Sequence, residues 1–329
     1  MRVIDVHNHF YPPAYIERLR SHGTGSRVSV TDDADGNPCV HYPGDCNVLV
    51  PGHRDVATRI RHLDEHGIAT QVLSFTTPGV HVESPGLAVE LARLVNDAFG
   101  RTVREGGGRF AALATLPLND PASSVMELER ALQELGLGGA MVFSNVNQVP
   151  LSDARYEPLW AAADRLGAVI YIHPTSPTGV EAMLDYWLMP LVGFPCDTTL
   201  AAAALVFAGV PARYPRIRWV LAHMGGAVPF IAERLDRGYR AFAECRRHID
   251  RRPSEYLRTF FYDTVNFHPA AVRLALDFAG SDRLLAGSDY PHQIGSLPEM
   301  LETIRALGLD ERSAEGILGG NARTLFNCG

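Results

Sequence analysis

The amino-terminal stretch Met1-Arg2-Val3-Ile4-Asp5-Val6-His7-Asn8-His9 combines a short apolar run with two closely spaced histidines. Val3, Ile4 and Val6 are typical of a short buried strand. Side chains along a strand alternate between its two faces, so His7 and His9 point the same way. The stretch therefore predicts two imidazoles side by side at the carboxyl end of a strand. They could form a metal pair, or they could be two polar residues that close the strand.

The composition is that of an ordinary globular chain. It has 329 residues, of which 46% are hydrophobic and 20% charged, enough to bury a large core. The net charge of −7 argues against binding to nucleic acid, because that requires a basic surface patch. The longest apolar run, residues 200–210, is too short to cross a bilayer, and Asp5 lies where a signal peptide would be apolar. We expect a cytoplasmic protein without nucleic-acid or membrane partners.

Lysine and cysteine usage narrow the chemistry. All 30 cationic side chains are arginine, which excludes a Schiff-base lysine and a carboxylated lysine that bridges two metals. The five cysteines form no C-x-x-C motif and are odd in number, which favours free thiols in a reducing compartment.

Helical and strand patterns alternate along the chain. Strands are predicted at residues 3–6, 70–75, 109–116, 140–143, 168–172, 217–222, 259–263 and 283–286. Helices are predicted between them, among them 54–66, 181–187, 196–208 and 227–242. Such alternation indicates parallel strands, and eight units favour one (β/α)₈ TIM barrel domain over residues 1–329. An open doubly wound sheet is the alternative, but no G-x-G-x-x-G motif follows a strand.

One region interrupts this alternation. Residues 11–52 are rich in proline and glycine, and we interpret them as an insertion over the active-site mouth. Within it, residues 27–31 and 38–42 flank a turn and alternate apolar and polar side chains, which predicts a small hairpin.

Three further strands end in side chains of the metal-ligand type, namely His173, His223 and Asp289. The carboxyl ends of barrel strands converge on one mouth, so these residues should meet His7 and His9 there. Three neutral imidazoles and one carboxylate suit a single divalent ion, with zinc preferred and manganese or iron tolerated. The fourth imidazole could then move protons near neutral pH.

The other histidines lack a second ligand at metal spacing. We expect them on the surface; they include His22, His53, His62, His66, His81 and His248.

Several segments resemble the metal-dependent amidohydrolase superfamily, and specifically its decarboxylase branch, typified by 2-amino-3-carboxymuconate-6-semialdehyde decarboxylase. The resemblance covers nearly the whole chain. It is carried by residues 4–9, 186–188, 222–230, 287–291 and 320–322, with the His-x-Gly-Gly and Tyr-Trp-Leu blocks specific to the branch.

The resemblance implies roles for individual residues. One metal would be held by His7, His9, His173 and Asp289, without an organic cofactor. His223 would be the acid/base, and either His223 or Asp289 would protonate the substrate carbon. Substrate contacts would come from Trp187, His292 and Arg234, the last lent across a homodimer interface. On sequence alone, Arg234 is equally well a solvated helix arginine.

Two departures from the branch pattern concern the pocket. The insertion reads Cys39-Val40-His41-Tyr42 where the branch has a carboxylate-binding arginine, and His292 replaces an apolar aromatic residue. We therefore expect a non-oxidative decarboxylase of another aromatic or dienoic carboxylic acid. The alternative is a hydrolase or hydratase acting on a related carboxylate, lactone or ring-cleavage product. A binding protein on a barrel scaffold would leave the metal's open coordination position unexplained.

Overall fold

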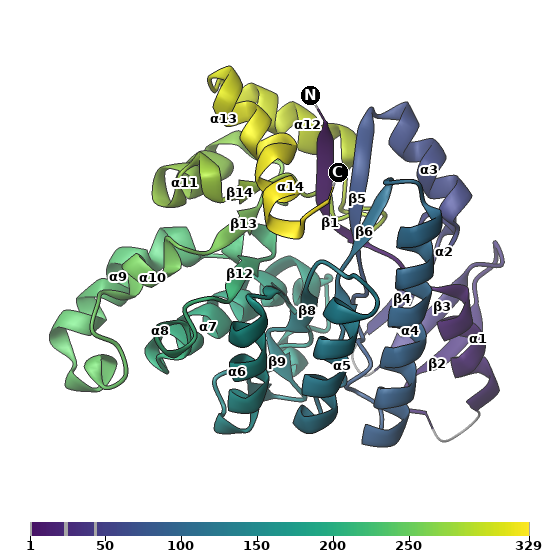
Figure 1. Cartoon of the computed structure of the whole chain (residues 1–329), viewed down its shortest axis with the longest axis horizontal. Helices are drawn as coiled ribbons and strands as arrows, with labels where there is room; N and C mark the ends of the chain where they lie inside the picture. The colour runs from purple at the N-terminus through teal and green to yellow at the C-terminus, as the bar shows by residue number, and fades with distance from the viewer. Residues whose placement is uncertain (1, 23–25, 43–44, 329) are drawn as a thin grey trace.

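The computed structural model describes residues 2–22, 26–42 and 45–328. Parallel strands occupy its centre, and helices lie outside them (Figure 1). Strands form at all eight predicted positions, and the predicted strand at residues 109–116 is divided into two short strands. The strands are β1 (Val3–His9), β5 (Ile68–Ser74), β6 (Phe110–Ala112), β7 (Ala114–Thr115), β8 (Ala140–Phe143), β11 (Val169–His173), β12 (Arg218–Leu221), β13 (Phe261–Asp263) and β14 (Leu284–Leu285).

The central strands form two parallel sheets, with the orders β1-β5-β6 and β14-β13-β12-β11-β8-β7. Leu113 lies between β6 and β7, and its N–H donates to Leu73 O at 2.9 Å. At the opposite edges, Val6 N–H donates to Ala286 O at 2.9 Å, and Asn8 forms a parallel bridge with Tyr290. Hydrogen bonds therefore connect the first strand of the chain to the segment that follows the last one.

Helices alternate with these strands. The longer ones are α3 (Val56–Glu65), α4 (Pro85–Glu105), α5 (Pro121–Gln133), α6 (Glu157–Leu166), α7 (Phe194–Phe207), α9 (Val228–Ala241), α11 (Pro269–Ala279) and α12 (Leu297–Ala306). The shorter ones are α2 (Pro51–Arg54), α8 (Val210–Arg213), α10 (Pro253–Leu257), α13 (Glu311–Glu315) and α14 (Asn321–Phe326). Several begin at a capping carboxylate; Asp120, for example, accepts from Ser123 N–H at 3.1 Å before α5.

The core between the strands is apolar. It contains residues of β1, β5, β11 and β12, and it is continued by Ala322, Leu325 and Phe326 of α14. The last helix therefore packs against the strand interior, while the carboxyl ends of the strands are left to polar residues.

The insertion is more ordered than a single hairpin. β2 (Ser29–Asp32) and β3 (Pro38–Tyr42) pair antiparallel, and β4 (Asp45–Val48) adds a third strand. Helix α1 (Pro13–His22), which we did not predict, precedes them and buries Tyr15, Ile16 and Leu19. Their three- and four-residue spacing is helical, but the flanking prolines and glycines masked it. Residues 23–25 and 43–44 of the insertion lie outside the described chain.

The predicted helix at residues 181–187 is wrong. Only one 3₁₀ turn forms there, over Val180–Met183, and Tyr186 and Trp187 adopt left-handed backbone conformations with φ of 57° and 56°. A π-helix, Met189–Gly193, then leads directly into α7. The helix after the break therefore starts earlier than the predicted residue 196.

The helical run Met189–Phe207 is apolar and long enough to cross a membrane by length and composition alone. Part of it is buried, and Ala202, Leu205 and Val206 belong to the main hydrophobic core. A core helix has the same composition, so this criterion by itself does not identify a membrane segment.

Candidate metal centre

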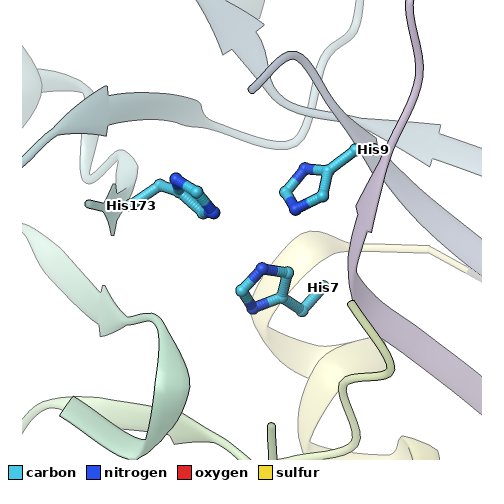
Figure 2. Close-up of side chains that lie close together, drawn as sticks. All are labelled: His7, His9 and His173. Atoms are coloured by element: carbon cyan, nitrogen blue, oxygen red, sulfur yellow. The ribbon is translucent and has the colours of Figure 1, made fainter. Parts of the chain in front are cut away.

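Three histidines from two separate strands converge at the carboxyl ends of the strands. His7 and His9 come from β1, and His173 is the last residue of β11. Their candidate ligand atoms lie within 4.8 Å of one another, and all three residues are buried. Figure 2 shows the three rings turned toward a common point. The prediction that these residues meet is therefore confirmed.

Asp289 and His223 complete this group. Asp289 Oδ1 lies 3.1 Å from His9 Nε2 and 3.4 Å from His7 Nε2. Asp289 Oδ2 lies 4.0 Å from His223 Nε2. Both residues have left-handed backbone conformations, with φ of 57° for Asp289 and 51° for His223. Such conformations are costly for residues other than glycine and are concentrated at functional sites.

The hydrogen bonds of the three imidazoles fix which nitrogen faces the centre. Nδ1 of His7 lies 2.6 Å from Asp263 Oδ2, and Nδ1 of His173 lies 2.7 Å from Pro174 O. Nδ1 of His9 lies 3.2 Å from Ser74 Oγ, whose own hydroxyl donates to Asn8 O. Each Nδ1 therefore serves as the donor, and each Nε2 is left with a lone pair.

The electrostatic environment differs among these rings. Burial lowers the pKa of both His9 and His173 well below the usual value, so these imidazoles are neutral at pH 7. Burial also acts to lower the pKa of His7, but the nearby charge of Asp263 raises it overall. Burial lowers the pKa of His223 to about 4, and the neighbouring His7 adds to this effect.

Asp263 was not predicted as a site residue. It ends β13, is fully buried, and accepts hydrogen bonds from the Tyr171 hydroxyl at 2.5 Å and from His223 N–H at 3.1 Å. Burial acts to raise its pKa, but the charge of His7 and these hydrogen bonds keep the pKa below its usual value. The signal was present in the sequence, since the predicted strand 259–263 also ends in a carboxylate.

A family model described as "Amidohydrolase" matches residues 4–328. The chain belongs to the amidohydrolase family. It is 33% identical over 330 residues to 2-amino-3-carboxymuconate-6-semialdehyde decarboxylase of Dictyostelium discoideum, an alignment that covers 97% of this chain and 90% of the relative. The resemblance inferred from the sequence is thereby confirmed.

Two solved structures are also similar to this amidohydrolase. 5-Carboxyvanillate decarboxylase from Sphingomonas paucimobilis matches with a TM-score of 0.87 and 29% identity, covering 100% of this chain and 99% of that one. A dihydroxybenzoic acid decarboxylase from a Polaromonas species, solved with manganese and the inhibitor 2-nitroresorcinol, matches with a TM-score of 0.83 and 27% identity, covering 99% and 97%. These relatives are carboxy-lyases, and one of them carries a divalent metal ion.

The donor set of this amidohydrolase fits such an ion. The buried Nε2 atom of His7 has no hydrogen-bond partner among the described residues, and it lies close to the carboxylate of Asp289. An imidazole nitrogen in that position is costly to bury unless it binds something. Neutral imidazole lone pairs beside a carboxylate are the ligands that divalent transition metals prefer.

Of the three predicted substrate-binding residues, one lies at the site and two are exposed. A ligand atom of His292 lies within 4.8 Å of ligand atoms of His9 and Asp289, so this residue joins the site. Trp187 is 62% exposed beside the start of the π-helix. Arg234 is exposed on α9, and it makes no ion pair within the described part of the chain.

Two of the histidines expected on the surface are buried. His53 is 1% exposed and His81 is 2% exposed, whereas His248 is exposed and His22, His62 and His66 are partly buried. The expectation was wrong for His53 and His81 because both occur in segments that pack over the strand ends. His53 follows the insertion, and His81 lies in the connection between β5 and α4.

Proposed function

We propose that this amidohydrolase is a metal-dependent, non-oxidative decarboxylase of an aromatic or dienoic carboxylic acid. The observation that carries the proposal is the convergence of three Nε2 lone pairs, one carboxylate and a fourth imidazole at one end of the strands. The decarboxylase relatives, one of them 33% identical over 97% of the chain, support the same reaction class.

The fold that holds this site is inferred to be a closed (β/α)₈ barrel in one domain. The hydrogen bond from Val6 to Ala286 and the bridge between Asn8 and Tyr290 support closure between the first and last strands. We also infer that the insertion covers the mouth. Asn47 of β4 donates to Thr77 O at 2.7 Å, and Thr77 lies in the connection that follows β5, which ends at Ser74.

The metal would be held by His7, His9, His173 and Asp289 as one ion per chain, without an organic cofactor. Zinc is the ion that this donor set favours, and manganese is the alternative that a relative supports. When bound, the ion supplies Lewis-acid stabilisation of negative charge that develops on the substrate.

The protein's own part in the reaction is to position the substrate and to move one proton. The bond between the ring carbon and the carboxylate breaks, its electron pair stays on the carbon, and carbon dioxide leaves. A proton must then reach that carbon. His223 is the proposed carrier, because its ring nitrogen lies 4.0 Å from Asp289 at the centre of the site; its neutral imidazole takes up the proton from solvent water and passes it to the carbon. Asp289 is the other group placed to deliver it.

We also infer that the protein is a homodimer in which Arg234 reaches the pocket of the partner subunit. Large apolar side chains are exposed around the start of α7 and on α9, among them Tyr186, Trp187, Leu191, Val192 and Phe230. A contiguous exposed apolar surface usually marks an interface. Five free cysteines support a reducing, cytoplasmic location.

The experiment that tests the reaction class is a panel of aromatic and dienoic carboxylic acids assayed for carbon dioxide release. Each acid is incubated with protein loaded with zinc or manganese, and with protein stripped by a chelator. Metal-dependent release from at least one acid is the expected result. If no acid in the panel loses carbon dioxide but lactones or esters are hydrolysed, the hydrolase alternative replaces the proposal.

A further inference from the structure

A cavity of about 320 Å³ lies at the amino-terminal end of β1, away from the proposed metal centre. Its walls come from the start of the chain, from α13 and α14, and from the π-helix Gly316–Gly320 that joins these two helices. Figure 1 shows both helices in the same part of the molecule as the start of β1. Arg2 precedes β1, and at about 3.3 Å per residue the ligand His7 lies about 17 Å further along. The proposed reaction therefore does not use this cavity.

Positive charge dominates the lining of the cavity. The charged residues that line it are three arginines and one glutamate, namely Arg2, Arg312, Arg323 and Glu315. They bring a net charge of +2 into one concave surface of a chain whose net charge is −7. Within the described part of the chain these arginines form no ion pair, and Arg2 alone donates a hydrogen bond from its side chain, to Gly108 O at 3.5 Å. Like charges without a counter-ion repel one another, so a bound anion would stabilise this arrangement.

The cavity stays open because two of its lining residues have no side chain. Gly316 and Gly320 have ordinary helical backbone angles, with φ of −54° and −59°, so the backbone does not require glycine at either position. An added Cβ atom would make no contact shorter than 3.3 Å at either one. Gly319 differs, because a Cβ atom there would collide with Arg2 O. Glycine weakens a helix, and π-helical turns are frequent at functional sites, so both glycines fit a binding role.

The number and kind of charges indicate the ligand. A phosphoryl dianion balances a net charge of +2 and has three terminal oxygens, one for each guanidinium, whereas a carboxylate has two. We propose that the cavity is a binding site for a phosphoryl group, either as free phosphate or as part of a small phosphate ester. Glu315 accepts hydrogen bonds, which suits a hydroxyl group on the carbon part of an ester. This inference does not depend on the proposed decarboxylase function.

The test is calorimetric titration of the metal-loaded protein at one ionic strength, set with sodium chloride. The probes are inorganic phosphate, α-glycerophosphate, the dicarboxylate succinate, and glycerol. At least one of the two phosphates should bind, and about tenfold or more tightly than succinate, because guanidinium groups hold the phosphate oxygens directly. The tighter of the two identifies free phosphate or an ester as the source. Succinate binding as tightly as both phosphates, or no binding of either phosphate, would overturn the proposal.

Variants locate the binding site. Arg312→Gln and Arg323→Gln should each weaken phosphate binding about tenfold, the usual effect of removing a charge-assisted hydrogen bond. Gly320→Leu, which keeps every charge but fills the cavity, should weaken it as well. Arg247→Gln is the matched control, since Arg247 is also exposed but lies outside the cavity. Because both arginines are exposed, their replacement should leave the melting temperature unchanged, which is measured on each preparation.

A last variant separates this site from the metal centre. His173→Ala, which is expected to lose the metal ion, should bind phosphate as tightly as the wild type does. If binding is lost in His173→Ala and retained in both arginine variants, the phosphate lies at the metal centre and the proposal is wrong. The assay of carbon dioxide release is run beside these titrations, so a failure of the proposed decarboxylase function is recognised separately.

Discussion

The Nδ1 atom of His7 lies 2.6 Å from Asp263 Oδ2, although the two residues are 256 positions apart in the sequence. The same carboxylate oxygen accepts hydrogen bonds from the Tyr171 hydroxyl and from the backbone N–H of His223. One buried carboxylate thus orients a proposed metal ligand and anchors the segment that carries the proposed acid/base.

Replacing this carboxylate should weaken the metal site. Asp263→Asn removes the charge that holds His7 with Nδ1 as donor, and partners of this kind typically contribute 10–100-fold in metal affinity. We expect a loss of about that size, measured by competition with a fluorescent chelator. Asp250→Asn is the matched control, since Asp250 also accepts a tyrosine hydroxyl but is exposed. Unchanged metal affinity in Asp263→Asn would contradict the assigned role.

The proposed ligand set predicts one ion per chain. Chelation should remove activity, and zinc or manganese should restore it, because the four ligand residues persist without the ion. Elemental analysis of the purified protein checks the stoichiometry, with His248→Ala as the variant that should retain full metal content. Two tightly bound ions per chain, or full activity with none, would show that the assignment is wrong.

Mutation should separate the catalytic role of His223 from the metal-binding role of the proposed ligands. His223→Ala is expected to keep its ion and lose about 10²- to 10⁴-fold in turnover, the usual contribution of an acid/base group. Metal content and turnover are measured on the same preparation, beside His173→Ala, which should lose the ion. If His223→Ala is purified without metal while His173→Ala retains it, the two roles are exchanged.

The buried side chain of His81 should make the free energy of unfolding depend on pH. Burial lowers its pKa to about 4 from 6.5. The unfolded chain therefore takes up a proton near pH 6.5, and the folded protein does not until the pH nears 4, so stability is lost as the pH falls between these values. At about pH 5 this residue should account for about 2 kcal/mol of that loss.

His81→Gln should remove this contribution. The measurement is the free energy of unfolding by urea at neutral pH and at about pH 5, for the wild type, His81→Gln and the exposed control His248→Gln. The decrease on acidification should be smaller in His81→Gln alone. An equal decrease in all three proteins would mean that His81 does not resist protonation in the folded state.

The proposed dimer can be tested by complementation. Arg234 lies on α9 and is exposed. A helix advances about 1.5 Å per residue along its axis, so the later turns of α9 extend away from the metal centre of their own chain. If each Arg234 serves the partner's pocket, mixing inactive His223→Ala with inactive Arg234→Ala and allowing exchange gives dimers with one intact pocket. Activity should partly return. The negative control mixes His223→Ala with His173→Ala: both residues serve the pocket of their own chain, so each pocket of a mixed dimer keeps one defect and no activity should return. No recovery with the Arg234→Ala mixture, despite demonstrated exchange, would contradict a role for Arg234 in the partner's pocket.

The sequence by itself determined the α/β class, the strand positions and the meeting of His7, His9, His173, His223 and Asp289. Alternating apolar segments identify parallel strands, and a ligand at a strand's carboxyl end has its position fixed by that topology. The same rule could have found Asp263, which also ends a strand. The short-range pattern was sufficient because each of these residues lies within a few positions of the end of an apolar run.

Only the tertiary structure decided which histidines are buried and which ring nitrogen each one presents. The burial of His53 beside His292, and the acceptor that Ser74 provides for His9, involve side chains from different segments. Local patterns also failed at Tyr186 and Trp187, where the backbone turns left-handed. Burial, tautomer and backbone strain depend on long-range packing, and a single sequence does not encode that packing in its local periodicity.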